Sequence, residues 1–328
     1  MNNEKSGPAV IKKTGKTRET LRNVWQKFGT VIILLTMCCI ATLIQPRFLT
    51  YPNLMNVARQ VSIVAIMATG MTLVVISGGV DLSVSTVANL AGCVAADLMV
   101  RGYPMILSML IGLATGALAG AVNGLAVTRG KTPPFIATLG MLWVARGAVL
   151  LYTNGMTIIG LPQSFVKIGT AWLGPVPVPV VIAICIMVLG HIFLRYTRFG
   201  LHLFATGGNV EVARVSGIHV ERIKLSAYIL SGTLAALGGL VLTARVFSGQ
   251  PTLADGMELQ AVAATVIGGT PLSGGEGSLL GTALGVAIMG VLTNGLNLLN
   301  VSAYWQHVAI GSIIVAAVIM DVWRRQKR

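Results

Sequence analysis

Charged residues are scarce in this chain of 328 residues, because Asp, Glu, Lys and Arg together make up only 10% of it. A soluble domain carries about 25% charged residues, so this chain could not cover a surface that faces water. Apolar residues make up 54%, and long uncharged runs recur along the sequence. A helix needs roughly 20 apolar residues to cross a bilayer. The composition therefore argues against most soluble enzyme classes and indicates an all-α, polytopic membrane protein.

Cysteine and histidine are also few, with four residues of each. The cysteines all lie in apolar runs without CxxC spacing or a Cys/His cluster, so the sequence indicates neither a disulfide framework nor a metal site. The apolar runs contain no HExxH motif, no Ser/His/Asp arrangement and no paired carboxylates, which makes an intramembrane enzyme remote. We expect no catalytic residue, no metal and no resident cofactor. The cysteines are Cys38, Cys39, Cys93 and Cys185.

Apolar windows and helix breakers predict ten membrane spans. The spans are expected at residues 28–45, 54–77, 83–100, 104–127, 134–152, 177–195, 225–245, 257–269, 278–298 and 304–322. The eighth is too short to cross a bilayer unaided. Around them we expect a basic arm (1–27), a transmembrane domain (28–323) and a basic tail (324–328).

The basic residues predict the orientation of these spans. The formal net charge is +14, but the bases cluster at span ends, which indicates a topology signal rather than nucleic-acid binding. With the amino terminus inside, 18 Lys and Arg fall on inner segments and four on outer ones. Basic residues favour the cytoplasmic side. We therefore expect about ten transmembrane helices with both termini in the cytoplasm.

Glycine recurs every four residues in the predicted fourth span, at Gly112, Gly116, Gly120 and Gly124. Lipid supplies no hydrophobic drive between helices, so small residues that allow close backbone approach take its place. We expect this stripe to pack against another helix. A substrate path lined by glycine is the alternative.

The longest inner connection covers roughly residues 196–224. Gly207-Gly208-Asn209 is typical of a turn, and Asn209 can cap a helix that starts near Val210. Gly217 can end this helix in a left-handed conformation. A helix of about two turns is not stable alone, so it needs a partner surface, either in this chain or in another.

This loop resembles the coupling segment of ribose-type ABC importer permeases, in the branched-chain amino acid/ribose permease family. The resemblance covers about residues 46–321 and rests on separated blocks in the same order. The blocks are residues 76–83, 123–124, 131–140, 248–251, 258–259, 266–270 and 294–299. The chain departs from the family at Val212, where paired alanines are common, at Ser85 in place of Gly and at Gln260 in place of Asp.

The resemblance implies a monosaccharide import permease in a bacterial inner membrane. Its implied partners are two ABC ATPase domains or subunits, a second permease copy in a homo- or heterodimer, a periplasmic sugar-binding protein and membrane lipid. ATP is expected on the ATPase subunits, because Gly130-Lys131-Thr132 has the wrong spacing from Gly124 for a phosphate-binding loop. The residues implied in coupling to the ATPase are Gly207, Gly208, Asn209, Glu211, Ala213, Arg214 and Gly217.

A stand-alone ion-coupled sugar carrier is the alternative function. Such carriers usually need acids within the membrane for a proton or cation relay. The clear embedded candidate is Asp97, which lies near the end of a predicted span.

Polar residues within the predicted spans mark a candidate translocation path. Asn and Gln offer both donors and acceptors to a hydroxylated sugar, although hydrogen bonds between helices are an alternative for each of them. The path candidates are Asn89, Arg146, Gln260, Asn294 and Asn297. Arg59 is expected to snorkel outward. Asp81 is either an inner gate or an N-cap of the third span.

Overall fold

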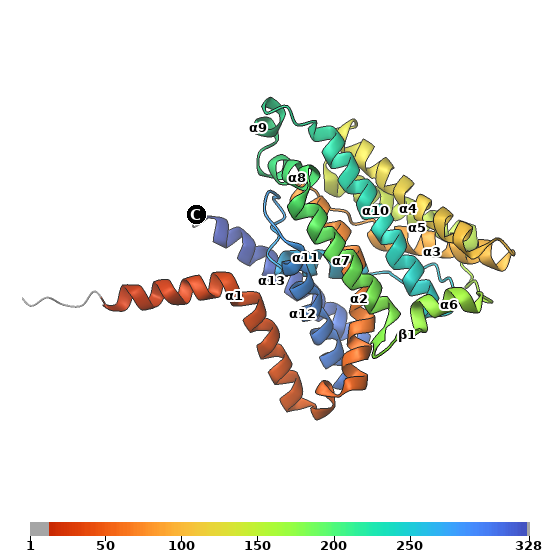
Figure 1. Ribbon diagram of the computed structural model, residues 1–328, viewed down its shortest axis with the longest axis horizontal. Coiled ribbons are helices and arrows are strands. Elements are labelled where there is room, and N and C mark those ends of the chain that lie inside the picture. Colours follow the sequence, from red (N-terminus) through yellow and green to blue (C-terminus); the bar gives the residue numbers. More distant parts are fainter. Residues whose placement is uncertain (1–12, 327–328) are drawn as a thin grey trace, which may run out of the picture.

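The computed structural model describes residues 13–326, and Figure 1 shows them as a bundle of helices. Within this part of the chain there are thirteen α-helices, one 3-10 helix and a two-stranded antiparallel hairpin. The helices are α1 (Lys13–Ile44), α2 (Tyr51–Ile76), α3 (Val84–Val100), α4 (Met105–Thr128), α5 (Pro134–Thr153), α6 (Gln163–Thr170), α7 (Val178–Tyr196), α8 (Arg198–Gly208), α9 (Val210–Val215), α10 (Val220–Arg245), α11 (Met257–Ile267), α12 (Leu279–Leu298) and α13 (Ala303–Gln326). The 3-10 helix η1 is Pro46–Leu49, and the strands are β1 (Trp172–Leu173) and β2 (Val176–Pro177).

Each predicted span coincides with a helix, and the prediction of a helical, polytopic membrane protein is confirmed. Six helices among the described residues are long and apolar enough to cross a membrane: α2, α4, α5, α7, α10 and α12. Shorter apolar helices are Gly29–Ile44 within α1, α3 and α11. With 11 residues, α11 is as short as the sequence predicts for the eighth span.

The structure differs from the predicted boundaries in two places. Helix α1 already begins at Lys13, inside the predicted basic arm, and residues 1–12 of that arm lie outside the described residues. The connection before α7 is not a plain loop, because it contains α6 and the β1–β2 hairpin. Pro162 precedes α6 and Pro177 precedes α7, and proline favours the start of a helix while interrupting its interior.

Helix α2 forms the centre of the bundle. Ile63, Ile66, Met67 and Met71 are fully buried, and α2 packs against α7, α10, α11 and α12. In contrast, only 28% of the apolar window of α4 and 17% of those of α5 and α7 are buried. Lipid rather than water suits these outer faces, which is why the spans of this chain are apolar on more than one side.

The glycine stripe of α4 packs against α10, as the sequence predicts. A Cβ atom on Gly116 would overlap the carbonyl oxygen of Gly232, and one on Gly120 would overlap that of Tyr228. Gly232 is equally close to the carbonyl of Gly116, so the two backbones touch. The packing interpretation therefore replaces that of a path lined by these glycines.

We expect Gly116→Ala to destabilise the protein, since the added methyl group would force α4 and α10 apart. Overpacking of this kind typically costs about 1–3 kcal/mol. Thermal unfolding of the detergent-solubilised protein would measure the loss. Gly147→Ala on α5 is the matched control, because a Cβ there meets nothing within 4 Å. Equal melting temperatures for the two variants would contradict the close α4–α10 contact.

Candidate functional site

The two short helices of the predicted coupling segment lie together at one end of the bundle. In Figure 1, α8 and α9 stand at the top, whereas α6 and β1 lie at the opposite end. Thr197 caps α8 by accepting a hydrogen bond from the Gly200 amide at 3.3 Å. The segment is thus ordered helix rather than a loose loop.

Asn209 caps α9, as predicted. Its Oδ1 atom accepts hydrogen bonds from the amides of Glu211 at 3.0 Å and Val212 at 3.1 Å. Arg214 then donates to Glu211 at 3.2 Å and to Glu221 at the start of α10 at 2.8 Å. These exposed pairs contribute little to stability. The hydrogen bond and charge of Glu221, with a smaller effect of Glu211, raise the pKa of Arg214 above its usual value, so it stays charged.

The predicted turn at Gly207-Gly208 is wrong. Both glycines belong to the last turn of α8, and the chain leaves the helix only at Asn209, where the backbone is extended. The helix after it, Val210–Val215, is close to the predicted two turns. Gly217 does adopt the predicted left-handed conformation, with φ +81°.

Gly207 is needed for packing rather than for turning the chain. A Cβ on Gly207 would overlap the carbonyl oxygen of Ile76, the last residue of α2, and would lie 2.6 Å from the Gly275 amide. That amide donates a hydrogen bond of 2.9 Å to the same Ile76 carbonyl. The end of α8 therefore rests directly on the end of the central helix α2 and on the loop before α12.

Helix α9 presents apolar side chains away from the protein. Ala213 is buried, while Val212 is 57% and Val215 84% exposed. Six residues do not make a helix that is stable by itself. A helix that is anchored on one side and apolar on the other suits a partner protein that covers the exposed side.

Asp81 lies in a buried hydrogen-bond network between α2 and α3. Its Oδ1 accepts from the Ser83 amide at 3.1 Å and the Ser83 hydroxyl at 2.6 Å, and its Oδ2 accepts from Ser231 of α10 at 2.8 Å. Asn123 of α4 donates to Ser83 at 2.9 Å. The N-cap position of α3 is Ser83 itself, so Asp81 forms a turn before α3 and joins α3 to α4 and α10.

Two of the predicted path residues come together through an acid that the sequence analysis did not select. Asn89 of α3 donates to Asp255 Oδ1 at 3.0 Å and accepts from the Ala254 amide at 2.8 Å. Arg146 of α5 forms an ion pair with Asp255 Oδ2. We call Asn89, Arg146 and Asp255 the polar triad. It joins α3, α5 and the turn before α11.

Asp255 escaped the sequence analysis because it lies outside the predicted spans. Functional acids are expected within apolar windows, and Asp255-Gly256 just precedes such a window. Arg146 was the available signal, since an arginine within a span needs an acidic partner or water. Which acid of the chain pairs with Arg146 can be seen only in the folded structure.

The other path candidates lie elsewhere in the structure. Gln260 is partly buried on α11. Asn294 of α12 exchanges two hydrogen bonds of 3.0 Å with Asn53 of α2. Asn297 accepts from Gln306 of α13 at 2.7 Å. Because Asn294 and Asn297 use their amides between helices, the structure does not bring them into the polar triad.

Arg59 lies near the end of the bundle that is opposite to α8 and α9. Its guanidinium lies 5.1 Å from the ring centroid of Trp172, and within the described residues its buried Nε has no hydrogen-bond partner. Arg59, Trp172, Tyr51 and Asn56 line a cavity of about 380 Å³. Arg245 is close enough for its charge to interact with that of Arg59. This end of the molecule is thus positively charged and aromatic.

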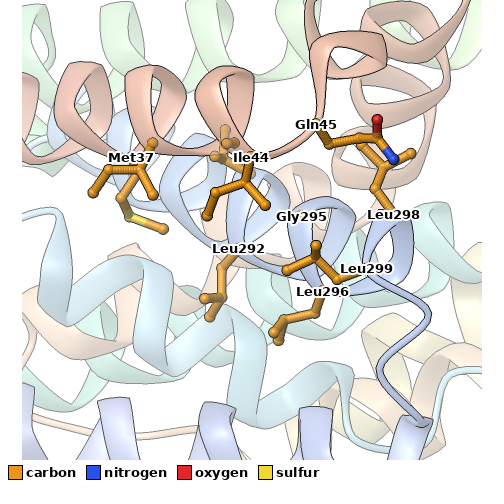
Figure 2. A pocket seen from close by; sticks show the side chains of 11 residues that line it. Met37, Ile44, Gln45, Leu292, Gly295, Leu296, Leu298 and Leu299 are labelled. Atoms are coloured by element: carbon orange, nitrogen blue, oxygen red, sulfur yellow. The ribbon is translucent and has the colours of Figure 1, made fainter.

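A separate cavity of about 160 Å³ lies between α1 and α12. Figure 2 shows that almost all of the side chains around it are hydrocarbon, and Gln45 at its edge is the polar one. A hydroxylated ligand would leave its donors and acceptors unpaired there, which costs free energy. This cavity is unsuited to a sugar.

Residues 13–326 contain neither a cluster of metal ligands nor a disulfide bond. No three His, Cys, Asp or Glu side chains of this part gather as a metal site would require. Its four cysteines are free thiols. The polar triad and the α8–α9 segment are the candidate functional groups that the predicted residues form.

Comparison with known proteins identifies close relatives of the whole chain. Residues 53–318 match a family model described as the permease component of a branched-chain amino acid transport system. The ribose import permease protein RbsC of Bacillus subtilis (strain 168) is 42% identical over 310 residues, which cover 94% of this chain and 96% of that protein. RbsC of Escherichia coli (strain K12) is 42% identical over 296 residues, covering 89% and 92%.

A permease that is named for another sugar is less similar to this chain. The D-allose transport system permease protein AlsC of Escherichia coli (strain K12) is 35% identical over 299 residues, which cover 90% of this chain and 92% of that protein. No solved structure matches the chain.

Proposed function

Because this chain belongs to the family of branched-chain amino acid transport system permease components, we propose that it is the membrane subunit of an ATP-driven monosaccharide importer. The similarity to ribose permeases over nearly the entire length carries this proposal. The more distant allose and xylose permeases support the same class of cargo. Ribose is the sugar we expect, since the ribose permeases are more similar to this chain. None of the relatives named above is described as an ion-coupled carrier.

The proposed orientation follows the basic residues. We place ten spans across a bacterial inner membrane, with both termini, α8 and α9 in the cytoplasm. The excess of Lys and Arg on those segments supports this placement. ATP would then be hydrolysed by separate ATPase subunits, two of which would face a permease dimer.

The α8–α9 segment is the proposed contact with the ATPase. Closing ATPase subunits would hold the exposed Val212 and Val215 of α9, and α8 would pass the movement to Ile76 and the Gly275 loop. Shifting a two-state pore from 1:99 to 99:1 takes roughly 5.5 kcal/mol. A capped helix in direct backbone contact with α2 can transmit such a bias, whereas a flexible loop would absorb it.

At the opposite end, we propose that the soluble sugar-binding protein docks near Arg59 and Trp172. Arg59 and Arg245 supply positive charge there, and Trp172 is 47% exposed. Acidic side chains on a partner would complement this surface and speed association. The sugar would next meet the polar triad, which offers amide, guanidinium and carboxylate groups to hydroxyls.

Reconstitution in liposomes tests the proposed function. We expect radiolabelled ribose to enter only when the ATPase subunits, binding protein and ATP are all present. Liposomes with the permease alone serve as the control. Uptake by the permease alone, driven by a proton or sodium gradient, would favour the ion-coupled carrier instead. In cells, Asn209→Cys in a cysteine-free background should react with an impermeant thiol reagent only from the cytoplasmic side.

A further inference from the structure

A basic cavity of about 160 Å³ lies where α7, α8 and the start of α12 meet. Its polar and charged side chains are His191 and Arg195 of α7 and Ser278 before α12. Leu201 and Phe204 of α8 supply an apolar wall. The side chains that line the cavity carry no negative charge, and Glu276 immediately precedes the lining residue Gly277. The walls of the cavity are therefore basic, which favours an anion.

The start of α12 adds to the positive potential of this cavity. Ser278 caps the helix by accepting from the Gly281 amide at 3.0 Å, and the helix continues for 20 residues. The first amides of a helix and its dipole favour a negative charge near the N-terminus. Together with Arg195 and His191, they form a site that is suited to a phosphate group.

The face of α7 that carries these basic residues continues as an apolar surface along the span. Ile184, Val188, His191 and Arg195 follow one another at spacings of three or four residues, so they share one side of the helix. Ile184 is 55% and Val188 51% exposed. Tyr196, 73% exposed at the end of the helix, is typical of the boundary between membrane and water. The surface thus changes from apolar to basic over one helix length.

We propose that this cavity binds the phosphate of an anionic phospholipid, whose acyl chain lies along Ile184 and Val188. Basic pockets between membrane helices suit such headgroups. A soluble partner could reach Arg195 but not the apolar part of the same face, which is why lipid fits better than an ATPase subunit. The bound lipid would contact α7, α8 and α12 at once and so hold α8 in place against the bundle.

Native mass spectrometry of the purified full-length chain tests this site. With phosphatidylglycerol added to the detergent, the wild type should retain lipid, and with phosphatidylcholine much less. The variant Arg195→Gln with His191→Gln should bind phosphatidylglycerol roughly tenfold more weakly, since a hydrogen bond to a charged group is lost. Arg198→Gln is the control: it removes the same charge from an exposed residue that does not line the cavity.

A charge-retaining variant, a folding control and a phosphate competitor complete the experiment. Arg195→Lys retains the charge and should keep most of the lipid, and size-exclusion profiles will show whether each variant is folded. Unchanged lipid binding in the double variant, or equal loss in Arg198→Gln, would overturn the proposal. Displacement of the lipid by inorganic phosphate at equal concentration would also overturn it. The assay uses neither sugar nor ATP, so its outcome is independent of the proposed transport function.

Discussion

Gly207→Ala is expected to reduce ATP-driven ribose uptake tenfold or more while leaving the protein in the membrane. The new methyl group would overlap the backbone of Ile76 and press on Gly275, so the end of α8 would move away from α2. Overpacking typically costs about 1–3 kcal/mol, and each 1.4 kcal/mol corresponds to a factor of ten. Uptake in proteoliposomes and ATP hydrolysis measured on the same samples would show hydrolysis without transport.

The adjacent glycine provides the control for this experiment. Gly208 belongs to the same helical turn, but a Cβ on it meets nothing within 4 Å. Gly208→Ala leaves the contact between α8 and α2 intact, so we expect it to lose much less uptake than Gly207→Ala, even though Gly208 lies in the proposed ATPase contact. If both variants lost uptake equally, the loss would come from any substitution in the last turn of α8 and not from the contact with α2. If Gly207→Ala transported normally, the contact between α8 and α2 would not carry the coupling.

Asp255→Ala is expected to lower both uptake and thermal stability. The change leaves Arg146 and Asn89 without their shared acceptor. Arg146 and Asp255 are 32% and 28% exposed in their side chains, so water compensates only in part. Removing one member of a fully buried pair costs about 3–5 kcal/mol, and we expect about half of that here. Uptake should fall at least tenfold, because the polar triad also loses its carboxylate.

A double variant separates structure from transport. Arg146→Met combined with Asp255→Leu removes both charges, so stability should recover towards the wild type, whereas uptake should not. Asp97→Asn is the comparison. Its ion-pair partner Arg101 is 66% exposed, whereas Asp97 is 19% exposed and also accepts a hydrogen bond from Tyr152, so we expect a loss of stability smaller than that of Asp255→Ala and little change in uptake. Normal transport by the double variant would reduce the triad to a structural role.

Several features of this chain follow from local sequence. Length and hydropathy predict helices at ten places because a membrane offers no other partner for backbone amides. Glycine every four residues predicts close packing of α4, since the spacing alone aligns the residues on one face. Asn209 before a helix predicts a cap, because the interaction spans only three residues.

The tertiary structure decided the features that depend on distant segments. The sequence Gly207-Gly208 predicts a turn. In the structure Gly207 instead packs against Ile76, which lies 131 residues earlier in the chain. Asn89, Arg146 and Asp255 come from three separate parts of the chain. Periodicity and composition describe neighbours along the chain, whereas these contacts depend on how helices are placed beside each other. The sequence therefore predicted where the apolar helices lie, and only the packing decided which polar groups meet between them.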